Sequence, residues 1–262
     1  MPRTVVVIPC FNEARRLPGD EIVSYAQRHP DVGFLLVNDG STDDTLRLLE
    51  KTAEQAPEHV EVLDLPRNSG KAEAVRQGMQ RALQSEASYC GYLDADLATP
   101  LSEIPRFIER LDADPEREIV YGARVALLGR QIVRSPVRHY LGRVFATVAS
   151  MVLGLPVYDT QCGAKLFRAG PLARELFAEP FVANWVFDVE VLARVIAAWR
   201  RDGGLPPERI VYELPLLQWI DVAGSKVKGG DFLRAIGELV RIRSRYLRRG
   251  SSGRGAQRPG AA

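Results

Sequence analysis

The first half of the chain alternates short apolar runs with helical patterns, and this alternation limits the fold more than any other feature. The run over residues 4–8 is β-branched, apolar on both faces and ends at Pro9, as expected of a central parallel strand. Regular alternation predicts an α/β fold in which helices flank both faces of a mostly parallel, Rossmann-like sheet. The expected strands cover residues 4–8, 33–38, 60–65, 89–93 and 119–123.

The composition is that of one globular domain with a single well-buried core, since 46% of the 262 residues are hydrophobic and 26% are charged. The net charge is +2, but residues 241–258 hold seven arginines and no acids, so the rest of the chain carries 2 − 7 = −5. The three cysteines are far apart and form no CxxC pair, which favours packing roles in a reducing cytosol. The scattered histidines indicate no metal site, and the absence of an apolar signal segment leads us to expect no export.

Two carboxylates follow the fourth expected strand. Asp94 and Asp96 are separated by one small residue in what must be a turn after residues 89–93. Alternate residues of extended backbone point the same way, so both carboxylates can reach one hard divalent cation that leaves positions for water and phosphate. Such a triplet is also typical of turns and helix caps, so the neighbouring loops must decide between the two interpretations.

The loops after the first three expected strands add polar residues at the sheet edge where open α/β sheets bind ligands. The first loop is Pro9-Cys-Phe-Asn-Glu13, and the second strand closes on Asp39, which either accepts hydrogen bonds from a base or ribose or shapes a turn. Gly70 and Lys71 open the third helix, where free N–H groups and the helix dipole favour anions. Their spacing is not that of a P-loop.

Four motifs in this order resemble the family 2 inverting glycosyltransferases with the GT-A fold: VVIPCFNE, VNDGSTDDT, RNSGKAEAVRQGM and YLDADLATP. Three later segments, DTQCGAKLFR, WVFDVEVL and QWIDVAGSKV, are similar to the branch that makes polyprenyl-phosphate sugars, the dolichyl-phosphate glucosyltransferases and mannose synthases. The resemblance covers roughly residues 4–228. It implies a GT-A domain over residues 1–230 that transfers a hexose from a nucleotide sugar.

The resemblance also implies a donor site. It assigns Asp94 and Asp96 to a metal–diphosphate motif that binds Mg²⁺ or Mn²⁺, which would stabilise the departing diphosphate as a Lewis acid. Lys226, which follows Gly-Ser in a flexible loop, could close over the diphosphate. The other residues assigned to the nucleotide sugar, UDP- or GDP-hexose with UDP-glucose as the first expectation, are Pro9, Asn12, Glu13, Asp39, Gly70 and Lys71.

The acceptor side is implied by the later motifs, which assign to it Gln161, Cys162, Gly163 and Lys165. A phosphate acceptor also needs cations, and Arg124 and Arg138 are the further candidates. A phosphate monoester has a second pKa of about 6, so it is already ionised at neutral pH and requires no strong base.

A hydroxyl acceptor would instead need a carboxylate to take its proton. Asp188, which with Glu190 matches an acidic pair at the start of a later helix, is the candidate for this role. The same position also suits an acid that stabilises a helix N-terminus.

Two basic and apolar segments bear on membrane attachment. Arg130, Arg134 and Arg138 are four residues apart, as on one helical face, and precede an apolar run over residues 144–153 that is too short to span a bilayer. Residues 231–249 predict a basic amphipathic helix, and residues 250–262 a disordered tail. Both segments either lie in the headgroup region, on the inner face of the cell membrane, or pack on the domain itself.

Three functions are weighed. The favoured one is hexose transfer onto a polyprenyl phosphate at the cytoplasmic membrane surface. The second is the same chemistry on a soluble hydroxyl acceptor, and the third is a non-catalytic binder of nucleotide sugars or nucleic acid. The arginine-rich tail lacks interleaved aromatic residues, so it is a poor platform for nucleic acid. The oligomeric state stays open.

Overall fold

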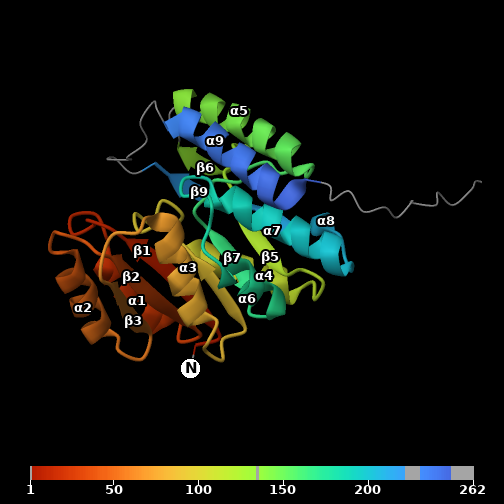
Figure 1. Ribbon diagram of the computed structural model, residues 1–262. Coiled ribbons are helices and arrows are strands. Elements are labelled where there is room, and N and C mark those ends of the chain that lie inside the picture. The colour runs from red at the N-terminus through yellow and green to blue at the C-terminus, as the bar shows by residue number, and fades with distance from the viewer. Residues whose placement is uncertain (1, 134–135, 222–230, 249–262) are drawn as a thin grey trace, which may run out of the picture.

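The computed structural model describes residues 2–133, 136–221 and 231–248, and its centre is a seven-stranded sheet (Figure 1). The strand order is β3-β2-β1-β4-β7-β5-β8, in which β7 is antiparallel to both neighbours and the other pairs are parallel. The strands are β1 (Thr4–Cys10), β2 (Val32–Asp39), β3 (Val60–Leu65), β4 (Tyr89–Tyr92), β5 (Ile119–Ala123), β7 (Lys165–Arg168) and β8 (Val211–Pro215). A separate parallel pair joins β6 (Gln131–Val133) and β9 (Gln218–Ile220).

The helices form a layer on each face of this sheet, so the predicted α/β architecture is confirmed. Side chains of β1 alternate between the layers, because Val7 belongs to one hydrophobic core and Ile8 to the other. The core on the side of Val7 includes α3 (Lys71–Ala82), α6 (Pro171–Ala178) and α7 (Phe187–Asp202). The core on the side of Ile8 includes α1 (Gly19–Arg28), α2 (Thr45–Gln55), the 3₁₀ turn η1 (Leu101–Glu103) and α4 (Ile104–Asp112).

Strand register brings the polar loops to one edge. Cys10 lies opposite Asn38, and Val7 lies opposite Tyr92, so the loops after β1, β2 and β4 leave the sheet side by side. The expected end of the first strand at Pro9 is wrong, since β1 continues through Cys10. Pro9 is tolerated because β4 has already ended on the side to which its missing N–H would point.

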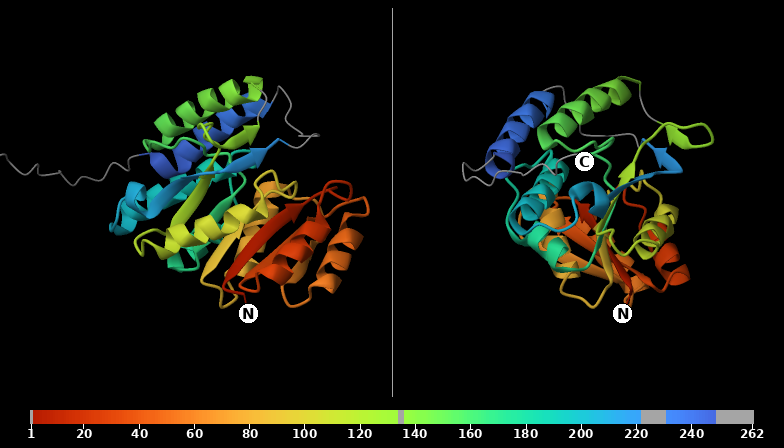
Figure 2. Two further views of the ribbon diagram at one scale, coloured as in Figure 1. Left: turned by 180° about the vertical axis from the view of Figure 1, so that it is seen from behind. Right: turned by 90° about the vertical axis from the view of Figure 1, so that its right-hand side faces the viewer.

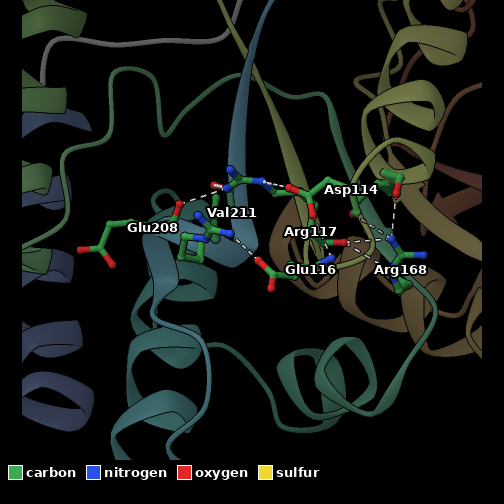
Figure 3. A network of polar contacts seen from close by, with 8 residues as sticks. Asp114, Glu116, Arg117, Arg168, Glu208 and Val211 are labelled. Atoms are coloured by element: carbon green, nitrogen blue, oxygen red, sulfur yellow. Dashed lines mark hydrogen bonds and ion pairs between the residues drawn. The ribbon is translucent and has the colours of Figure 1, made fainter.

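The opposite edge of the sheet is tied together by arginines (Figure 3). Arg168, at the end of β7, donates to the carbonyl groups of Leu111 and Arg117. Arg117 in turn donates to the carbonyls of Val211 and of Glu208 in the short helix α8 (Pro207–Ile210). The arginine of the DTQCGAKLFR motif is therefore structural and points away from the acidic turn.

Three helical elements form an outer layer on α7 (Figures 1 and 2). They are α5 (Pro136–Leu153), α9 (Asp231–Ile242) and the π-helical turn η2 (Arg243–Leu247). Leu239 and Ile242 of α9 are buried against the domain, whereas Ile236 and Val240 are exposed. No helix among the described residues is long and apolar enough to cross a membrane.

The expected arginine face over residues 130–138 is wrong. Arg130 precedes β6, outside α5, and its guanidinium donates to the carbonyl groups of Pro215 and Leu216. Arg134 lies outside the described residues, as do Lys226 and the expected tail over 250–262. Arg138 falls in the first turn of α5, and its side chain is outside the described part of the structure.

Candidate active site

A cavity of about 270 Å³ lies at the edge where the loops after β1, β2 and β4 meet the start of α3. It brings together most of the residues that the sequence assigns to the donor, although these come from four separate segments. Those in its wall are Pro9, Glu13, Asp39, Gly70, Lys71, Asp94 and Asp96. Phe11, Arg16 and Asn68 also line the cavity and were not predicted from the sequence.

Asp39 shapes the corner at the start of α3. Its carboxylate accepts hydrogen bonds from the backbone N–H groups of Ser69 (2.8 Å) and Gly70 (2.9 Å), and burial raises the pKa of Asp39 despite these two donors. Gly70 has φ +91°, a conformation that side chains with a Cβ rarely adopt. Asp39 therefore both borders the cavity and holds the backbone that presents Lys71.

The loop after β1 is tied to the loop after β2. Asn12, with φ 54°, donates its N–H to Ser41 Oγ at 3.0 Å and accepts at Oδ1 from the N–H of Thr42 at 2.9 Å. Asn12 thus braces the two loops from outside the cavity wall. Glu13 is paired with Arg16, whose Nε lies 2.8 Å from Glu13 Oε2. The only sequence signal for Arg16 was its position three residues after Glu13.

The acidic turn places Asp94 and Asp96 on the cavity. Asp94 forms an ion pair with Lys71, and its side chain is 38% exposed, so it remains open to a ligand. Leu97, directly after the pair, has φ +47°, a conformation uncommon for leucine. Gly163, in the predicted acceptor segment over residues 161–165, packs against Asp94 so closely that a Cβ at that position would overlap the carboxylate.

The electrostatics of the two carboxylates differ. Burial opposes ionisation of Asp94, but the charges of Lys71, Lys165 and Arg124 outweigh it and hold the pKa of Asp94 below its ordinary value. The pKa of Asp96 is raised by burial and by the negative charge of Asp94. A divalent cation bound to both carboxylates would offset the repulsion between their negative charges.

These two carboxylates fit a magnesium or manganese ion, because both metals prefer oxygen ligands. The described residues contain no cluster of three or more His, Cys, Asp or Glu side chains suited to a metal. Such an ion leaves coordination positions for diphosphate oxygens and water beside Asp94 and Asp96.

Lys165 and Asp188 form a buried ion pair beside the cavity. Lys165 Nζ lies 2.7 Å from Asp188 Oδ1 and donates to the Cys162 carbonyl at 2.5 Å. The hydroxyl of Tyr92 donates to the same Asp188 oxygen at 2.6 Å. The side chains of Lys165 and Asp188 are 0% and 5% exposed. Both predicted residues therefore lie next to the site, but they are buried in the protein and do not face the open cavity.

The rest of the acceptor segment is held by a second ion pair. Arg124 contacts both oxygens of Asp159, at 2.7 and 2.8 Å, and lies 5.2 Å from the ring centre of Trp219. Cys162 is buried, and burial raises the pKa of its thiol to about 11. Thr160 Oγ1 and Gln161 Nε2 are buried without a hydrogen-bond partner among the described residues. Such unpaired groups are uncommon, and the described residues contain three others away from the cavity, on Thr4, Tyr25 and His59.

The fold and the acidic turn are those expected of a GT-A glycosyltransferase, and comparison with known proteins gives the family. Residues 5–175 match the family described as Glycosyl transferase family 2. The chain is also 33% identical over 94% of its length to a dolichyl-phosphate beta-glucosyltransferase of Trichomonas vaginalis, of which it covers 72%. This chain therefore belongs to glycosyltransferase family 2, and the predicted resemblance is confirmed.

Solved structures share the fold. The glucosyl-3-phosphoglycerate synthase of Mycobacterium tuberculosis, in complex with Mn²⁺, UDP-glucose and phosphoglyceric acid, superposes with a TM-score of 0.60 at 18% identity, over 93% of this chain and 80% of that one. A mannosyltransferase of Pyrobaculum calidifontis, in complex with GDP-Man and Mn²⁺, gives 0.63 at 18% identity, over 96% and 66%. The GT-A expectation is confirmed by these structures.

Proposed function

We propose that this enzyme transfers a hexose from a nucleotide sugar to a polyprenyl phosphate at the cytoplasmic surface of a membrane, with a divalent metal ion and with UDP-glucose as the preferred donor. The observation that carries the proposal is the acidic pair Asp94 and Asp96 in a cavity that adjoins Gly163 and its acceptor segment. The relative from Trichomonas vaginalis, named for glucosyl transfer to dolichyl phosphate, supports the same acceptor class.

The donor half of the reaction needs positioning and charge. A bound Mg²⁺ or Mn²⁺ would neutralise the diphosphate as it leaves the anomeric carbon. Asp94 and Asp96 would hold that ion, and Lys71 lies beside Asp94 as a further cation for the diphosphate oxygens. Asp39 and Gly70 would position the nucleoside, because both line the cavity and Gly70 directly precedes Lys71.

The acceptor half favours a phosphate over a hydroxyl. A hydroxyl acceptor needs a general base, but the predicted base, Asp188, already accepts from Lys165 and Tyr92 and is almost fully buried. A phosphate monoester is ionised at neutral pH and can attack without one. Thr160 Oγ1 and Gln161 Nε2 lack a partner among the described residues and precede Gly163, which packs against Asp94, so an anion bound next to them would satisfy both donors.

The proposal that the protein acts at a membrane surface rests on the distribution of its exposed apolar side chains. Most of the exposed large apolar side chains in the described part of the chain belong to α5, to α9 and to the β6–β9 pair with its flanking loops. Figures 1 and 2 show these elements together at one end of the molecule. Exposed apolar side chains on neighbouring elements are typical of a contact with protein or lipid, and a lipid acceptor favours the second. The residues are Leu127, Leu128, Val133, Tyr140, Leu141, Val144, Met151, Leu217, Ile220, Ile236 and Val240.

Transfer should depend strictly on a divalent ion. The purified protein is incubated with a panel of UDP- and GDP-hexoses and a short-chain polyprenyl phosphate, with and without chelator, and the lipid product is identified by mass spectrometry. We expect glucosyl transfer from UDP-glucose that chelation abolishes and Mn²⁺ or Mg²⁺ restores. Activity that survives chelation would contradict the role of Asp94 and Asp96, and transfer to water-soluble hydroxyl acceptors alone would select the second function.

A charge on the exposed face of α5 should weaken membrane binding. Val144 is 54% exposed, so Val144→Asp leaves the core intact while it removes apolar contact, and vesicle partitioning should fall about 10-fold. Sedimentation with anionic phospholipid vesicles measures this. Leu205→Asp is the matched control, because Leu205 is also exposed but lies between α7 and α8, outside the outer layer. Equal loss in both variants would argue against a specific membrane face.

A further inference from the structure

Two buried glutamates hold the segment that leads into α7. Glu190 Oε2 accepts from the N–H groups of Val182 (2.8 Å) and Ala183 (2.9 Å). Glu238 Oε2 accepts from the N–H groups of Trp185 (2.9 Å) and Val186 (3.0 Å). Backbone N–H groups that are shielded from water need such partners, because leaving one unpaired destabilises the fold. Four N–H groups in five residues are therefore held by two carboxylates.

The second of these carboxylates comes from a distant part of the chain. Glu238 belongs to α9 and is 1% exposed, although a free glutamate would favour water. Its other oxygen lies 3.5 Å from a guanidinium nitrogen of Arg241 in the next turn. Its neighbour Leu239 packs into the domain core, so the helix is fixed against α7 at this point.

The segment that Glu238 holds ends at the site. Val186 directly precedes α7, whose first residue, Phe187, has its ring centre 6.0 Å from Lys71 Nζ. The next residue is Asp188, which pairs with Lys165. Because Lys71 also pairs with Asp94, a shift of the first turn of α7 would change the surroundings of Lys71 and so of the acidic turn.

We propose that Glu238 is a positioning residue of the active site: from α9 it fixes the N–H groups of Trp185 and Val186 and so holds Phe187 and Asp188 against Lys71 and Lys165. Nothing in the catalytic step touches Glu238 itself. The same helix exposes Ile236 and Val240. Helix α9 therefore contributes both to the proposed membrane face and, through Glu238, to the position of the residues beside the cavity.

The structural part of this proposal is tested without substrate. Hydrogen exchange followed by mass spectrometry reports the amides of Trp185 and Val186 in the full-length wild type, Glu238→Ala and Glu238→Gln. We expect exchange at these amides to be at least about 10-fold faster in Glu238→Ala, because both lose their acceptor. Glu238→Gln should stay within about 3-fold of wild type, since one amide oxygen can accept both bonds. Unchanged exchange in Glu238→Ala would overturn the proposal.

The functional part rests on the proposed function and is measured as kcat and KM per folded molecule. We expect kcat to fall about 10-fold or more in Glu238→Ala, with the donor KM within about 2-fold, because misplacement by an ångström is costly while the nucleotide wall at Asp39 and Gly70 is untouched. Glu238→Gln should restore most of kcat. Ile242→Ala is the matched control, since it removes buried packing from the same helix without touching the loop.

A purely structural role predicts a different pattern, in which Glu238→Ala and Ile242→Ala lower the melting temperature equally and keep wild-type kcat in the folded fraction. That result, or faster exchange with unchanged kcat, would overturn the positioning role while the proposed function stands. If the wild type transfers to no polyprenyl phosphate, the proposed function fails, and donor hydrolysis by the same variants decides the positioning role. If Glu238→Ala does not fold, Glu238→Asp replaces it, because the shorter side chain cannot reach both N–H groups.

Discussion

Asp96→Asn should lower kcat for hexose transfer by about 10³-fold, the scale seen when one preorganised electrostatic contact to a developing charge is removed. The substitution preserves shape and the hydrogen bond that Asp96 Oδ1 accepts from the N–H of Ala98 at 3.1 Å. What it removes is one of the two negative charges that would hold the metal ion. Steady-state transfer and calorimetric titration with Mn²⁺ measure the two consequences, and we expect metal binding in the presence of the donor to weaken in parallel.

The control for this substitution is Asp44→Asn. Asp44 precedes α2 as an exposed residue whose side chain makes no capping hydrogen bond, and it lies outside the cavity wall. Wild-type activity is expected from it. A wild-type rate in Asp96→Asn, with unchanged metal dependence, would show that the paired acids do not hold the catalytic ion.

Lys165→Met should lower the free energy of unfolding by about 3–5 kcal/mol, the cost of removing one partner from a buried ion pair. The side chain of Lys165 is completely buried, so Asp188 would be left with a negative charge, the Tyr92 hydroxyl as its remaining side-chain donor, and little access to water. Urea denaturation followed by circular dichroism gives the value. The loss would exceed what a surface pair contributes, which is about 0–1 kcal/mol.

The double variant Lys165→Met/Asp188→Asn serves as the control, because it removes the uncompensated charge and should recover part of the lost stability. Lys71→Met is the comparison for an exposed pair, since Lys71 and Asp94 are 43% and 38% exposed. A destabilisation of Lys165→Met no larger than that of Lys71→Met would contradict a buried pair at this position.

The sequence predicted β1 to β5 and the edge at which the site would lie, because both follow from local patterns, whereas β6, β7, β8 and β9 were not predicted. Apolar runs such as residues 60–65 and 119–123 coincide with β3 and β5, since a short β-branched run between turn signals specifies its own conformation. Asp39, Lys71 and Asp94 were found because each directly follows a strand or opens a helix. Their meeting in one cavity follows from the parallel register.

Local sequence patterns did not predict which charged residues pair with each other in the folded protein. Lys165 was assigned to the acceptor side, and its pairing with Asp188 was not predicted. The two residues are 23 positions apart in the chain, and no spacing rule connects a strand residue to a helix residue at that distance. The arginine face expected over residues 130–138 is wrong because α5 begins only at Pro136, and Arg130 donates to carbonyl groups at the end of β8. A helical spacing predicts a shared face only if the segment is helical from its first residue.

The sequence by itself determined the family, the α/β architecture and the position of the acidic turn, because motifs and periodicity are properties of neighbouring residues. Only the tertiary structure decided which charged groups face the cavity, as Asp94 does, and which form buried ion pairs, as Asp188 does. It also decided that a glutamate on α9 accepts hydrogen bonds from the residues just before α7. The physical reason is that burial and pairing are set by packing between segments remote in the chain, and the cost of an unpaired buried charge makes each such pairing specific.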